Sequence, residues 1–133
     1  MKKLTLEDLL NRKLNDGFQS KEVEVKTLGG TLTIVKQPLP TILRIVESMG
    51  NTSGISEQLS IFTDLIYKCT PILHDKTLQD KYGCAEPTDI VLKILDDNFD
   101  EISNIGTAIL EFYGDSLNGF SENLKKPSET IQN

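Results

Sequence analysis

The spacing of apolar residues changes once along the chain, at Pro38, and this change limits the possible folds more than any other feature of the sequence. Between Lys21 and Lys36 apolar and polar residues mostly alternate, as in strands with one buried face. After Pro38 apolar residues recur at every third or fourth position, as on one side of a helix. Two strands alone are only marginally stable, so helices must cover their apolar face. The pattern predicts an α+β fold that is mostly helical.

The strand region should form one β-hairpin, because Gly29-Gly30 separates two strand-like runs, Lys21–Leu28 and Thr31–Lys36. A glycine pair is a favourable two-residue turn between antiparallel strands. Such a turn fixes the register, since each residue of one strand then faces a defined residue of the other. The pairs predicted from it are Leu28 with Thr31, Thr27 with Leu32, and Val25 with Ile34.

An N-terminal helix and a layer of four to five further helices should complete the fold. The N-terminal helix is predicted over Leu4–Leu14, ending by Gly17, with acidic residues in its first turn, where negative charge is favourable. Its leucines at helical spacing are Leu6, Leu9, Leu10 and Leu14. The later stripes are Ile42, Ile45, Val46 and Met49; Ile55, Leu59, Phe62, Leu65, Ile66 and Cys69; Ile90, Val91, Ile94 and Leu95; and Ile102, Ile105, Ile109 and Tyr113.

Prolines, glycines and one polar pair mark the predicted helix ends. Pro40 and Pro87 open two helices, because proline suits the first helical turn. Asn98, followed three residues later by Glu101, resembles a capping box, in which each side chain binds the backbone N–H of the other residue. The predicted helix-ending glycines are Gly17, Gly50, Gly83 and Gly114.

We expect a single domain over residues 1–114 and a flexible C-terminal tail over residues 115–133. The tail is rich in Ser, Asn, Gly, Glu and Lys and has no apolar period, so it should be disordered. Within the domain, the apolar face of the hairpin should pack on the helical layer. The residues expected to meet there are Val25, Leu32 and Ile34 from the hairpin and Ile45, Phe62, Ile66, Ile94 and Ile109 from the helices.

The charge of the chain argues against nucleic acid and membranes as partners. It has 14 Lys and Arg against 20 Asp and Glu, a net charge of -6, so its field repels phosphate backbones and anionic lipid. No apolar run approaches the ~20 residues of a membrane helix. The N-terminus turns acidic before an apolar signal segment forms, so we expect no cleaved signal and a cytoplasmic location.

No residue pattern indicates catalysis, so we predict no catalytic, cofactor-binding or metal site. The single histidine, His74, lies in a polar stretch and is interpreted as a surface residue. Gly29-Gly30 could cradle a phosphate, but no P-loop lysine follows and the pair lies between two strands, which favours a turn. Of the two cysteines, Cys69 should lie in the core and Cys84 in a partly exposed loop.

An acidic cluster around residue 98 offers oxygen ligands and has two interpretations. Calcium or magnesium binding is possible for such carboxylates, but the ligand order of an EF-hand is missing. A helix-capping junction explains the cluster better. Its members are Asp96, Asp97, Asn98, Asp100 and Glu101.

The order of segments resembles the XkdN-like tail assembly chaperones of Gram-positive phages and PBSX-like prophages. The similarity runs from about Leu4 to Gly114 through LTLEDLL, LGGTLTI, LPTILRIVES, LIYKC, LQDKYGCAEPTDIVLKIL and EISNIGTAILEFYG. The segment 50–54 departs from the family pattern. The residues that fall in family order within the most specific block are Tyr82, Gly83, Cys84, Glu86 and Pro87.

This resemblance implies a non-enzymatic protein that acts in the host cytoplasm during viral morphogenesis and is absent from the mature virion. Its partner would be the tape measure protein, a long helical polypeptide that it keeps soluble while the tail tube polymerises around it. The tail tube protein would be a second partner. Weak self-association is also expected, since many copies must coat one extended partner.

Two other functions compete with this one. A structural tail or connector subunit would have the same size and lack of catalytic motifs, but it would remain in the mature particle. A small enzyme is the third interpretation, and a bound cofactor or metal in the purified protein would favour it.

Overall fold

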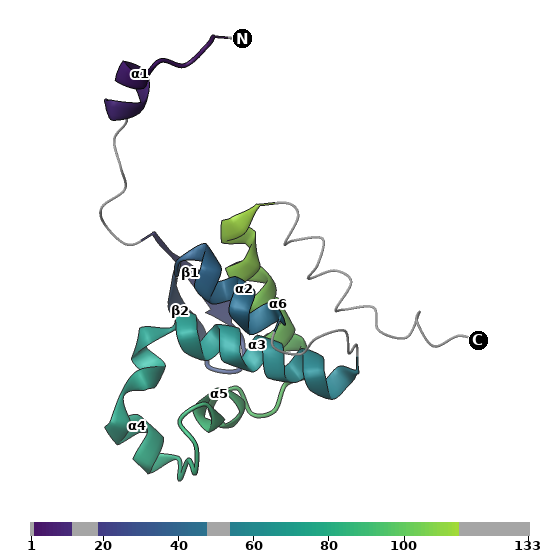
Figure 1. The fold of residues 1–133 in the computed structure, drawn as a ribbon. Helices are drawn as coiled ribbons and strands as arrows, with labels where there is room; N and C mark the ends of the chain where they lie inside the picture. Colours follow the sequence, from purple (N-terminus) through teal and green to yellow (C-terminus); the bar gives the residue numbers. More distant parts are fainter. Residues whose placement is uncertain (1, 12–18, 48–53, 115–133) are drawn as a thin grey trace, which may run out of the picture.

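The computed structural model describes residues 2–11, 19–47 and 54–114, and within them the fold is α+β and mostly helical, as predicted. Figure 1 shows the hairpin beside α2, α3 and α6. Predictions for Leu14, Gly17, Met49, Gly50 and the tail 115–133 lie outside the described residues. In chain order the elements are α1 (Leu6–Leu10), β1 (Ser20–Val25), β2 (Gly30–Val35), α2 (Leu39–Glu47), α3 (Ile55–Cys69), η1 (Pro71–His74), α4 (Lys76–Lys81), α5 (Asp89–Ile94), α6 (Phe99–Leu110) and η2 (Glu111–Tyr113).

The hairpin forms where it was predicted, but its register differs. Val25 pairs with Gly30, four positions from the predicted partner Ile34, so the two-residue turn was wrong. A four-residue loop, Lys26–Gly29, replaces it, and the N–H groups of Leu28 and Gly29 both donate to the Val25 carbonyl oxygen. Because the shift is an even number of residues, no side chain changes face. Val25 and Ile34 are therefore both fully buried, as predicted.

One apolar cluster holds the hairpin to the helices. It combines buried residues of both strands with residues of α2, α3, η1, α5 and α6, and α3 and α6 form the most extensive helix pair. The prediction that the hairpin packs on the helical layer is confirmed. Of the residues expected to meet there, Val25, Ile34, Phe62, Ile66 and Ile109 are buried, whereas Leu32, Ile45 and Ile94 are partly buried against the cluster.

The start of α3 differs from the predicted stripe. Ile55 was expected inside but is 60% exposed, because it is the first residue of the helix and burial begins only in the next turn. There Gln58 is buried, a polar residue that an apolar pattern could not identify. The predicted boundaries of the next helices are approximately correct. α5 begins two residues after Pro87, which was predicted to open it. Gly83, which was predicted to end the preceding helix, follows α4 and has a φ of +66°.

Gly106 sets the distance between α3 and α6. A Cβ atom at this position would overlap Cδ1 of Phe62, whose ring lies across the glycine. Gly106→Ala should therefore lower the free energy of unfolding by about 1 to 2 kcal/mol, since overpacking costs ~1–3 kcal/mol and alanine returns less than ~1 kcal/mol of helix propensity. Urea unfolding measures this change. The matched control is Asn104→Ala on the exposed side of α6, which gains propensity without the overlap. An equal or higher stability of Gly106→Ala would contradict the close packing.

Candidate functional site

His74 has a structural contact and no catalytic partner in the described part of the chain. It is exposed, as predicted, and its ring lies 4.4 Å from the Tyr67 ring, centroid to centroid. Its Nε2 donates to the Tyr67 carbonyl oxygen at 2.6 Å. This hydrogen bond joins η1 to the end of α3, so the histidine helps to fix a helix junction.

The two cysteines lie where the sequence placed them. Cys69 is fully buried in the core cluster, and this burial raises the pKa of its thiol to about 12. The group is therefore uncharged at neutral pH, which removes its nucleophilic form. Cys84 is partly buried, and both cysteines are free. The interpretation of Cys69 as a core residue is confirmed.

The acidic cluster is divided among different structural roles. Asn98 caps α6 by accepting the Glu101 N–H at 3.1 Å, as predicted. The reciprocal half of the capping box was wrong, because the Glu101 carboxylate reaches the hairpin loop instead. Asp96 and Asp97 adopt left-handed backbone angles between α5 and α6. Within the described ranges no three His, Cys, Asp or Glu residues gather as a metal would require.

Glu101 fastens the hairpin loop to the first turn of α6. Its carboxylate accepts the Lys26 N–H at 3.1 Å and the Thr27 N–H at 2.8 Å, and the Thr27 hydroxyl donates to it at 2.5 Å. These donors, with the Thr27 hydroxyl contributing most, lower the pKa of Glu101. The carboxylate thus accepts the hydrogen bonds of two N–H groups in the four-residue loop. It explains why the hairpin does not form the shorter glycine turn.

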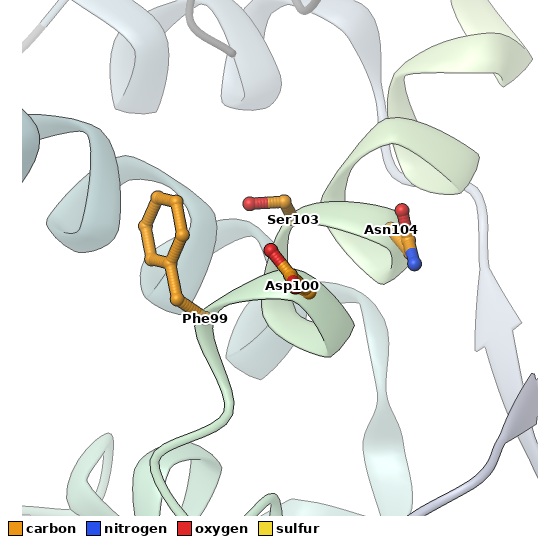
Figure 2. Close-up of a pocket in the computed structure, with 4 residues that line it drawn as sticks. All are labelled: Phe99, Asp100, Ser103 and Asn104. Atoms are coloured by element: carbon orange, nitrogen blue, oxygen red, sulfur yellow. The ribbon is translucent and has the colours of Figure 1, made fainter.

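A hollow of about 420 Å³ lies beside the first turns of α6 (Figure 2). In Figure 2 the Phe99 ring stands to one side, and Asp100 and Ser103 lie between it and Asn104. The Ser103 hydroxyl is buried and has no hydrogen-bond partner among the described residues, so none of them is in place as a base to activate it. A neighbouring hollow of about 330 Å³ shares Asp100 and Asn104 and continues to Glu24 on the hairpin. These side chains form a polar surface and no nucleophile–base pair.

The leucines of α1 form an apolar face that nothing in the described structure covers. Leu6, Leu9 and Leu10 lie at helical spacing, and these three and Leu4 are each more than half exposed. The helix has no buried residue, so the expected packing of an N-terminal helix on the domain is not seen. Figure 1 shows α1 apart from the other elements. A helix this short is unstable alone in water and gains stability from apolar packing.

The N-terminal end of α1 is nevertheless well formed. The Thr5 hydroxyl accepts the Asp8 N–H at 3.2 Å, and the Asp8 carboxylate accepts the Thr5 N–H at 2.9 Å. Lys2 forms an ion pair with the same carboxylate at 3.2 Å. These hydrogen bonds form a capping box that starts the helix at a fixed residue and therefore aligns the leucines on one side. The free leucine face of α1 is the best candidate for a binding site.

A second uncovered surface follows the outer edge of β2. A groove of about 250 Å³ runs beside this strand and is bordered by η1, where Ile72 is exposed. Sequence reasoning missed this surface, although the run Thr31–Val35 carries no charge, which is a usable signal at a sheet edge. The lining residues are Thr31, Leu32, Thr33, Val35, Pro71 and Ile72.

Comparisons with known proteins assign no relative to this chain. A scan against protein-family models finds no matching family, and searches of curated proteins and of solved structures find no similar protein. Among the helices of the described residues, none has both the length and the apolar character needed to cross a membrane. The two uncovered surfaces and the sequence pattern are therefore the guides to function.

Proposed function

We propose that this protein is a phage tail assembly chaperone that binds the tape measure protein, keeps it soluble and promotes polymerisation of the tail tube around it. The observation that carries the proposal is the uncovered leucine face of α1. A non-enzymatic role is consistent with the separate structural uses of His74, Cys69 and Glu101. The tail tube protein is the second partner that the family resemblance suggests.

The leucine face has the chemistry to bind an amphipathic helix. Leucines at positions i, i+3 and i+4 form a ridge that fits between the apolar residues of another helix. A long helical partner exposes such a stripe along its whole length and aggregates through it. Covering the stripe removes apolar surface from water, and the net charge of -6 keeps the coated complex soluble.

Most segments that carry the family resemblance form helices in this fold, and two of them, LGGTLTI and LQDKYGCAEPTDIVLKIL, also contain turns. Gly29 takes a φ of +68° in the hairpin loop, and Gly83 takes +66° after α4. Between α4 and α5, the Cys84 N–H donates to the Gln79 carbonyl oxygen at 3.1 Å, and the Glu86 N–H donates to the Asp89 carboxylate at 3.0 Å. These contacts fix the turns between neighbouring elements.

Co-expression with the tape measure protein of the same phage tests the proposal. We expect the tape measure protein to become soluble and to co-purify with this chain. The double variant Leu9→Ser, Leu10→Ser should bind at least about a hundredfold more weakly, because each buried leucine contributes roughly 1.5–3 kcal/mol and every ~1.4 kcal/mol is a tenfold change in affinity. Leu39→Ser, which changes an exposed leucine of α2, is the matched control and should bind normally.

Two outcomes would contradict the proposal. One is a tape measure protein that stays insoluble although this chain is folded and abundant. The other is equal amounts of this chain and of tail subunits in purified mature particles, measured by mass spectrometry. That result would favour the structural tail subunit instead.

A further inference from the structure

Side chains from the first two turns of α6 line the hollow of about 420 Å³ (Figure 2). They are Phe99, Asp100, Ser103 and Asn104. Side chains three or four positions apart are neighbours on a helix, with Cβ atoms about 5–6 Å apart. Phe99 and Asp100 both have this spacing to Ser103, so one bound group can contact all three.

The Ser103 hydroxyl is the feature of this hollow that indicates a ligand. The residue is only 5% exposed, and its oxygen has no hydrogen-bond partner among the described residues. In Figure 2 the hydroxyl points toward the side of the hollow on which the Phe99 ring stands. A buried hydroxyl without a partner is unfavourable, because it has lost its hydrogen bonds to water. A ligand that hydrogen-bonds to this oxygen offsets that loss.

The charges around the hollow select a cation. Asp100 is exposed and forms no ion pair or side-chain hydrogen bond with another described residue. The adjoining hollow of about 330 Å³ adds Glu24, Glu101 and one basic residue, Lys26. Among the described lining residues of the two hollows, carboxylates therefore outnumber cations. This balance repels phosphate and other anions and attracts a basic group.

A divalent metal fits this hollow less well than an organic cation does. Asp100 supplies the only carboxylate among its four described lining residues. Calcium takes six to eight oxygen ligands, and several of them are usually carboxylate oxygens. The half-buried Phe99 ring, in contrast, offers a flat apolar surface, and the face of an aromatic ring attracts organic cations.

We propose that this hollow binds an arginine side chain of a partner protein. The guanidinium group is planar and carries five N–H donors in a fixed arrangement. It donates to the Asp100 carboxylate and to the Ser103 oxygen while one of its faces lies against the Phe99 ring. A lysine ammonium is a compact, strongly hydrated charge and makes these contacts less well. The site lies on α6 and does not involve the leucine face of α1, so it goes beyond the proposed function.

Titration with N-acetyl-arginine amide, followed by NMR of the isotopically labelled full chain, tests the proposal. The amide signals of Ser103 and Asn104 should shift, with a dissociation constant in the millimolar range, because a single side chain makes few contacts. N-acetyl-lysine amide, which has the same charge, should bind at least about threefold more weakly. Inorganic phosphate should leave these signals unchanged. Absence of a shift with the arginine probe, or equal affinity for the lysine probe, would overturn the proposal.

Asp100→Asn removes the charge that pairs with the guanidinium and keeps the size of the side chain. The dissociation constant of the arginine probe should rise at least about tenfold, because charge-assisted hydrogen bonds are about twice as strong as neutral ones. Asp97→Asn is the matched control, since Asp97 does not line either hollow and asparagine also adopts its left-handed backbone angles. It should change binding by less than about twofold, because salt screens its charge. Equal effects of the two variants would contradict a direct contact with Asp100.

Ser103→Ala distinguishes a binding role from a structural one. Without the hydroxyl, the arginine probe should bind at least about threefold more weakly. The variant should nevertheless unfold at the same or a higher urea concentration than wild type, because it removes a buried hydroxyl without a partner and adds helix propensity. Unchanged arginine binding would overturn the proposal. Unfolding at a lower urea concentration would also overturn it, since the hydroxyl would then have a partner in the free chain. The probe is used without the tape measure protein, so this proposal and the proposed function fail separately.

Discussion

Replacing Phe62 by alanine should lower the free energy of unfolding by about 3 to 5 kcal/mol. Its ring is fully buried between α3 and α6, where it lies across Gly106. Removing a buried phenylalanine side chain loses its transfer free energy and leaves a cavity that the surrounding helices fill only in part. Here the partner surface is a glycine backbone, which has no side chain that could move into the space.

Urea unfolding followed by circular dichroism measures the effect of Phe62→Ala. The matched control is Tyr82→Ala, which removes an exposed aromatic side chain and should change stability by less than about 0.5 kcal/mol. A change near zero for Phe62→Ala would show that the ring is not part of the core. In that case the α3–α6 packing described above would be wrong.

Replacing Glu101 by glutamine should lower the free energy of unfolding at pH 7 by about 2 to 3 kcal/mol. The carboxylate accepts three hydrogen bonds from Lys26 and Thr27. Glutamine has one carbonyl oxygen, and its NH₂ group would face one of the donors. Hydrogen bonds to a charged acceptor are worth ~1.5–3 kcal/mol, and the single oxygen of glutamine cannot replace all three of them.

The same residue predicts how stability depends on pH. Because hydrogen bonding lowers the pKa of Glu101 in the folded chain, its contribution is fully present above the pKa of an unfolded glutamate, about 4.3. It is lost as the pH falls through the lower folded pKa. Wild type should therefore lose more stability than Glu101→Gln between pH 6 and pH 3. The exposed Glu47→Gln serves as a control, and parallel pH curves for wild type and Glu101→Gln would contradict the anchoring role.

Local sequence rules predicted most elements and missed the contacts between them. Alternation at residues 21–36 and helical spacing after Pro38 identified the hairpin and the helical layer correctly. The turn was wrong because its geometry is decided by Glu101, a residue more than seventy positions away, which no rule based on neighbours includes. The same side chain explains the incomplete capping box, since it binds Thr27 and does not return to Asn98.

The candidate binding surfaces were harder to predict than the fold. Helical spacing identified the leucines of α1 as one face but could not say whether the domain covers them, because amphipathicity does not name the partner. The edge of β2 was overlooked because strand patterns describe faces, whereas free edges follow from the ladder of hydrogen bonds. Ile72, which borders the groove, belongs to no periodic stripe at all.

The hydrogen bonds between Glu101 and the hairpin loop can form only late in the synthesis of the chain. The ribosome releases residues 20–35 well before residues 99–110, so the hairpin leaves first and its anchor on α6 leaves much later. Contacts of such long sequence separation form late, because a large loop must close before they contribute. The hairpin loop therefore lacks its carboxylate acceptor until α6 has been made. The completed helix α6 then supplies this acceptor and fixes the loop.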